Sequence, residues 1–68
     1  MISYDPLFRT MKEKQYSSYR LIKEGISKGI YSNIQSQKGI STHTLNKLCS
    51  ILDCRVEDII EYIPDENI

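Results

Sequence analysis

Apolar residues recur three or four positions apart along most of the chain, the spacing that places them on one face of a helix. The clearest instance is the stretch 42–52, where Leu45, Leu48, Cys49 and Leu52 follow this spacing. The same pattern predicts further short helices at about residues 6–14, 17–25, 28–37 and 55–63. Their expected inward residues are Leu7, Phe8, Met11, Leu21, Ile22, Ile30, Tyr31, Ile34, Val56, Ile59 and Ile60. No alternating strand pattern appears in the middle of the chain, so we expect an all-α fold of five short helices around one core.

Residues suited to helix starts precede the first two of these stretches. Asp5 is the expected N-cap of the first helix, and Pro6 suits its first position because a missing N–H costs nothing there. Ser17 is the expected cap of the second helix. The fifth stretch is poorly capped, because Cys54 or Arg55 stands where Ser or Asp would serve.

The tripeptide Gly-Ile-Ser occurs twice, at residues 25–27 and 39–41. In each copy we expect Gly to take the left-handed conformation that ends one helix and Ser to cap the next. Ile26 and Ile40 are spaced to pack against Tyr31 and Leu45 as hydrophobic staples. The tripeptide therefore marks helix boundaries, and the residues that flank it do not match as a repeat.

The two ends of the chain carry short β-prone segments. Residues 2–4 are largely apolar, and residues 61–63 are followed by Pro64. We expect a minor two-stranded pairing of the termini, which is weak on its own.

The length of 68 residues fits one small domain that spans residues 1–68. A domain of this size buries only roughly 60% of the surface of its unfolded chain. A second subunit is therefore expected, and its surface would include the fifth helix and the termini, with Ile60, Tyr62, Ile63 and Ile68.

Cysteine and histidine are too scarce for a compact zinc site, since the chain has only Cys49, Cys54 and His43. The sequence shows no signal peptide and no apolar run near the ~20 residues that a membrane span needs. We therefore expect a cytoplasmic protein with reduced thiols in its core, no metal or cofactor, and no membrane contact. No arrangement of nucleophile and base and no glycine-rich phosphate loop is present, so we expect no enzyme, and the chain is too short for a small-molecule sensing domain.

The net charge is zero, but the charges are unevenly distributed. Residues 9–47 carry eight basic and two acidic side chains, a net charge of +6, whereas residues 48–68 carry a net charge of −5. This asymmetry favours a basic face for a polyanion and an acidic end held away from it.

Residues 17–37 place two short helices on either side of a tight glycine turn, the arrangement of a helix-turn-helix DNA reader. On the outer face of the second helix, Lys28 can donate to guanine or phosphate. Asn33 can pair with adenine or contact the DNA backbone, and Ser32 can bond to a base or to the backbone. Gly29 would let the backbone approach DNA closely. Ile30 either packs in the core or meets a thymine methyl group.

Residues 16–59 resemble the Cro/cI-type helix-turn-helix family, also called the xenobiotic-response-element type, of phage repressors and small bacterial regulators. The residues that carry the resemblance are Ser17, Ser18, Leu21, Ile22, Gly25, Ile26, Ser27, Tyr31, Ile34, Lys38 and the segment STHTLNKLCSILDCRVEDII. The resemblance implies a lambda-repressor-like DNA-binding domain. It also implies that Lys28, Gly29, Ser32 and Asn33 face bases, and that Ser18, Ser27, Gln37 and Lys38 contact phosphates.

The sequence thus predicts a sequence-specific transcriptional regulator of duplex DNA, expected to be a repressor and a homodimer, with its third helix in the major groove. The alternative is a protein-interaction module, such as an antitoxin or anti-repressor, whose helix-turn-helix fold no longer binds DNA. The zero net charge and the pair Gly29 and Ile30 favour the alternative, whereas the basic segment favours DNA binding.

Overall fold

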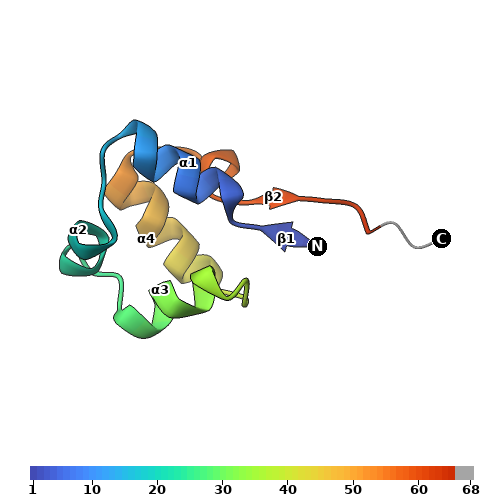
Figure 1. The fold of residues 1–68 in the computed structure, drawn as a ribbon, viewed down its shortest axis with the longest axis horizontal. Coiled ribbons are helices and arrows are strands. Elements are labelled where there is room, and N and C mark those ends of the chain that lie inside the picture. The colour runs from blue at the N-terminus through green and yellow to red at the C-terminus, as the bar shows by residue number, and fades with distance from the viewer. Residues whose placement is uncertain (66–68) are drawn as a thin grey trace.

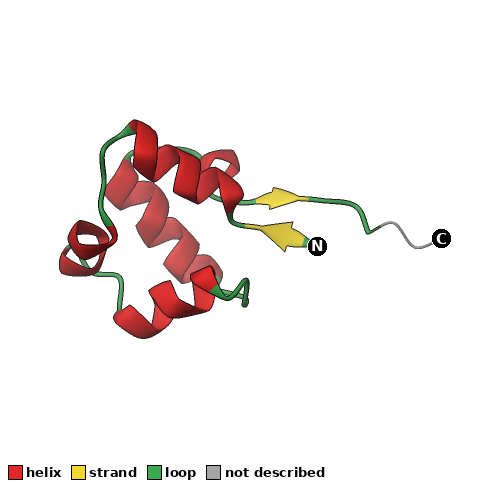
Figure 2. Cartoon of the chain, viewed as in Figure 1, coloured by secondary structure: helices red, strands yellow, loops and turns green. Residues whose placement is uncertain are grey.

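Four α-helices and one two-stranded ribbon make up the computed structural model, which describes residues 1–65 (Figures 1 and 2). In chain order the elements are β1 (Ile2–Ser3), α1 (Asp5–Glu13), α2 (Ser18–Lys23), α3 (Lys28–Gln35), α4 (Thr42–Leu52), the 3-10 turn η1 (Val56–Asp58) and β2 (Glu61–Tyr62). In Figure 1, α4 runs between α1 on one edge and α3 on the other, and the ribbon projects from the end opposite α2. The expectation of a mainly helical fold is confirmed.

The core joins residues from every helix. Leu7, Leu21, Ile34 and Leu48 are fully buried. The remaining buried apolar residues are Tyr4, Met11, Ile26, Leu52 and Ile59, and Phe8, Ile30, Tyr31, Leu45, Cys49 and Ile60 are partly buried against them. The helical spacing therefore predicted most of the core, and Tyr4 was missed because it lies outside any helix.

The start of α1 differs from the prediction. The helix begins at Asp5 itself, and Tyr4 occupies the N-cap position without a side-chain capping bond. Asp5 donates its backbone N–H to Ser3 Oγ at 3.2 Å. Asp5 thus lies in the first turn, where a negative charge interacts favourably with the helix dipole.

Serine caps the other three helices, as the sequence predicted for Ser17, Ser27 and Ser41. The hydroxyl oxygens of these residues accept the backbone N–H of Arg20, Ile30 and Thr44, each at 3.1 Å. Each bond satisfies one of the N–H groups that a helix start leaves without a partner inside the helix.

All four helices end with the same backbone bond, in which an N–H donates to the carbonyl five residues earlier. The pairs are Tyr16 to Met11, Ile26 to Leu21, Lys38 to Asn33, and Cys54 to Cys49. This bond needs a residue of positive φ just before its donor. Gly25 supplies it after α2 with a φ of 132°, as expected, but Gln37 and not Gly39 supplies it after α3 with a φ of 61°.

The predicted fifth helix is wrong. Only Val56–Asp58 form a 3-10 turn, and Val56 is exposed rather than buried. The reason is that the backbone beyond it pairs with the other end of the chain: Leu7 N–H donates to the Ile59 carbonyl at 3.1 Å, and β2 follows at once.

The expected pairing of the termini is present. β1 and β2 are antiparallel, with Ile2 opposite Tyr62 and Ser3 opposite Glu61. Main-chain bonds between Met1 and Ile63 extend the ribbon by one residue pair. Ile68, which we also expected on this surface, lies outside the described residues.

Candidate nucleic-acid interface

The turn between α2 and α3 is fixed from both sides. Its first part is the glycine end of α2, where Ile26 turns inward and is 1% exposed. The Nζ ammonium of Lys47 on α4 donates a hydrogen bond to the Gly25 carbonyl at 3.0 Å. This bond provides a cation at a helix C-terminus, where the dipole favours positive charge. The angle between α2 and α3 is thus held by α4 as well as by the turn.

One face of α3 packs on the protein and the other is open. Ile34 is fully buried, and Ile30 and Tyr31 are partly buried against the core. Lys28, Gly29, Ser32 and Asn33, the four residues predicted to face bases, are all exposed. The helix therefore presents donors and acceptors outward without apolar side chains between them.

Three of the four residues predicted to contact phosphate lie close to the two ends of α3. Ser27 caps its start, so the hydroxyl oxygen is used as an acceptor while its hydrogen stays available. Gln37 and Lys38 follow its end and are exposed. Ser18 stands apart from them, exposed in the first turn of α2.

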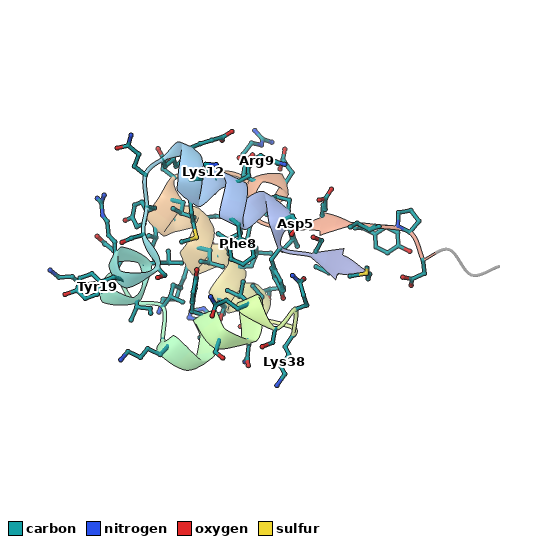
Figure 3. The ribbon with its side chains drawn as sticks, in the orientation of Figure 1. Asp5, Phe8, Arg9, Lys12, Tyr19 and Lys38 are labelled. Carbon is teal, nitrogen blue, oxygen red and sulfur yellow. The ribbon has the colours of Figure 1, made fainter. Side chains whose placement is uncertain are left out.

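The charges of the sequence separate in space. Residues 25–52 contain no Asp or Glu, so Lys28 and Lys38 stand at the two ends of α3 without an acidic side chain in this segment. In Figure 3, Arg9 and Lys12 lie on α1, at the edge opposite Lys38. The basic segment therefore does not form one face, because its first residues lie on the far side of the molecule.

The acidic end of the chain lies beside α1. Thr10 Oγ1 donates to the Asp58 carbonyl at 2.7 Å, which places η1 against α1. The two salt bridges within residues 1–65, Met1 N to Asp65 and Arg55 to Glu57, are also outside residues 25–52. Asp58 and these two salt bridges thus lie outside the segment that carries α3.

Two contacts around α3 could not be found from local sequence patterns. One is the Lys47 bond to Gly25, which joins residues 22 positions apart. The other runs from the Tyr4 hydroxyl to the Lys38 carbonyl at 2.6 Å, across 34 positions. The exposed α2 residues Tyr19, Arg20 and Lys23 were not predicted as candidates either.

Within residues 1–65, no helix is long and apolar enough to cross a membrane. The same part of the chain brings together no group of three His, Cys, Asp or Glu side chains that could hold a metal ion.

Two short helices joined by a tight turn, with the second open along one face, define a helix-turn-helix DNA-binding domain. Comparison with protein families agrees, because the Cro/C1-type HTH DNA-binding domain matches residues 7–65. The chain belongs to this family, as the resemblance in its sequence implied.

The chain is also similar to a solved structure, the transcriptional regulator VanUg. The two are 26% identical, with a TM-score of 0.85 over 94% of this chain and 87% of that one. Comparison with curated proteins gave no match.

Proposed function

We propose that the protein is a sequence-specific regulator of transcription that binds duplex DNA with α3 in the major groove. The observation that carries the proposal is the outward face of α3, where Lys28, Gly29, Ser32 and Asn33 are exposed. An α-helix fits the major groove, and amide and ammonium groups read adenine and guanine there. The regulatory role is supported by the likeness to the transcriptional regulator VanUg.

DNA binding is tested first by titration of random duplex DNA at two salt concentrations. Because phosphate contacts release counterions, affinity must fall as salt rises. Absence of binding at low salt, or binding that salt does not change, would reject the proposal and favour the protein-interaction alternative. Selection from a random duplex library then identifies the preferred site and shows whether it is palindromic.

The assignment of α3 to the major groove is tested by two substitutions. Asn33→Ala should cost roughly 1–3 kcal/mol at the selected site and relax specificity there. Lys38→Ala should weaken binding to all sequences about equally and reduce the salt slope by about 1. Unchanged binding of Asn33→Ala to the selected site would show that this orientation of α3 is wrong.

A homodimer is part of the proposal, with the second copy of the chain bound at the ribbon. Met1, Ile2, Tyr62 and Ile63 are each at least 39% exposed there. Among residues 1–65 the sheet has two strands, so within this part of the chain each strand also has one edge open to hydrogen bonding. Antiparallel pairing of the same edge from two copies is self-complementary, as a two-fold interface requires.

The proposed dimer must also present both of its α3 helices to DNA. The ribbon projects away from the helices, and α3 lies along one edge of the molecule (Figure 1). To read a palindromic site, the two-fold axis has to bring both α3 helices to one side of the dimer. Half-sites in successive turns of the groove are about 34 Å apart, so the two α3 helices need this separation.

Repression is the simplest outcome of such binding, because a dimer on a promoter blocks polymerase. Transcription in vitro from a promoter that carries the selected site should fall as protein is added. An increase in transcript would identify an activator instead.

A further inference from the structure

Most of the loop after α3 is exposed, and only Ile40 at its far end packs against the core. Gln37 takes a left-handed φ of 61°, and Lys38 and Gly39 are exposed. A Cβ built on Gly39 would meet nothing within 4 Å. The loop also borders an open, mainly apolar groove of about 200 Å³, whose other wall includes Ile2 and Ile60. Packing therefore does little to fix where residues 37–39 lie.

Two hydrogen bonds hold the backbone of Lys38 in place. Its N–H donates to the Asn33 carbonyl at 2.7 Å, at the end of α3. Its carbonyl accepts the hydroxyl of Tyr4 at 2.6 Å. Tyr4 is 3% exposed and belongs to the core, so its hydroxyl is a rigid anchor. The segment before α1 is thus tied directly to the end of the proposed reading helix.

We propose that Tyr4 is a positioning residue for DNA binding, which sets Lys38 and the end of α3 against the DNA backbone. The inference rests on the proposed function. A lysine side chain loses conformational entropy when it binds a phosphate. If its backbone is already fixed, no further backbone entropy is lost on binding. Tyr4 itself makes no contact with DNA in this proposal.

Thr10 offers a matched control. Like Tyr4 it is buried, at 4% exposure, and its hydroxyl donates to the carbonyl of a distant residue, Asp58, at 2.7 Å. That bond lies beside α1 and η1, away from α3. Tyr4→Phe and Thr10→Val each remove one such bond and keep most of the side-chain volume.

The experiment measures the affinity for random duplex DNA across a salt series for the wild type, Tyr4→Phe, Thr10→Val, Lys38→Ala and the double variant Tyr4→Phe/Lys38→Ala. We expect Tyr4→Phe to weaken binding roughly two- to tenfold, the effect of one neutral hydrogen bond. The dependence of its affinity on salt should become weaker and approach that of Lys38→Ala. The double variant should have the same affinity and the same salt dependence as Lys38→Ala. Thr10→Val should keep the wild-type slope.

Amide hydrogen exchange provides a readout without DNA. Exchange of the Lys38 N–H should be faster in Tyr4→Phe than in the wild type, whereas Thr10→Val should change it no more than its loss of overall stability requires.

The outcomes separate the two proposals. If the wild type binds and Lys38→Ala lowers the salt slope, but Tyr4→Phe does not, the inference about Tyr4 is wrong and the proposed function stands. Equal changes of slope in Tyr4→Phe and Thr10→Val would also overturn it, because general loss of stability would then suffice. A wild type that does not bind DNA overturns the proposed function, and the inference with it.

Discussion

Gly29 is a glycine that the fold does not require. Its φ is not positive, and a Cβ built there would meet only Ser27 Oγ at 4.0 Å. Glycine inside a helix is unfavourable relative to alanine, so an alanine would serve α3 better. We interpret Gly29 as a residue whose missing side chain lets DNA approach the backbone of α3 closely.

Gly29→Ala should therefore raise the free energy of unfolding by roughly 0.5–1 kcal/mol and weaken binding to the selected DNA site. Thermal or urea unfolding and a DNA titration measure the two effects. Gly39→Ala is the control, since it also has space and an ordinary φ, and it should stabilise by about 0.4–1 kcal/mol without loss of affinity. Full affinity in Gly29→Ala would contradict the role of Gly29.

Cys54 is a residue whose chemistry the fold suppresses. Burial, with a smaller effect from neighbouring Cys49, raises the pKa of the Cys54 thiol to about 11. The neutral thiol is thus favoured in the folded state, and stability from this group is lost as pH rises toward 11. Since the thiolate is the reactive form, this cysteine should be inert near neutral pH.

Alkylation rates against pH check this expectation. A Cys49→Ser variant keeps the burial that is the main cause of the raised pKa, so Cys54 should still react slowly with iodoacetamide at pH 8 and faster as the pH rises further. The same chain unfolded in urea should react at the rate of an ordinary cysteine. Equal rates in the folded and unfolded chains would show that the thiol is not protected.

At the scale of elements, the sequence predicted helix starts better than helix ends. Serine caps depend on a residue type at one position, and Ser17, Ser27 and Ser41 all act as expected. Helix ends depend on which residue takes a positive φ, and Gln15, Gln37 and Asp53 do so without being glycine. Gly39 was therefore a misleading signal for the end of α3, because the turn is completed two residues earlier.

The end of α1 offers a test of this strain. Gln15 has a φ of 57°, which costs a non-glycine residue about 1–2 kcal/mol. Gln15→Gly should raise the free energy of unfolding by about 0.5–1 kcal/mol, after the entropy cost of glycine in the unfolded chain. Glu13→Gly, within the last turn of α1, should instead lower it by roughly 0.5–1 kcal/mol. Urea unfolding distinguishes the two, and a loss of stability in Gln15→Gly would refute the explanation.

At the scale of the whole molecule, pairing between residues far apart in sequence determines features that local sequence patterns did not predict. The apolar spacing of Val56, Ile59 and Ile60 predicted a helix, but the backbone from Ile59 onward pairs with α1 and β1 instead. The basic segment was likewise read as one face, whereas Arg9 and Lys12 lie across the molecule from Lys38. The outward residues of α3 were predictable, because helical spacing alone fixes which side chains oppose Ile34.

The ribbon gives a prediction for the assembly. Tyr62→Ser together with Ile63→Ser should shift the protein toward monomer in sedimentation and weaken binding to a palindromic site more than to a single half-site. Val56→Ser, which removes an exposed apolar side chain from η1, is the matched control. It should change neither the oligomeric state nor the binding to the palindromic site. A double variant that stays as dimeric as the wild type would exclude the ribbon as the interface.

The bonds that join α1 to the end of the chain lead us to expect a particular order of folding. The helices from α2 to α4 are neighbours in sequence, whereas the bond from Thr10 to Asp58 closes a loop of 48 residues. Closing such a loop costs chain entropy that local contacts do not. We therefore expect α1 to dock fully only after residues 58–62 are available, and we expect the closure of this loop to be the slow step of folding.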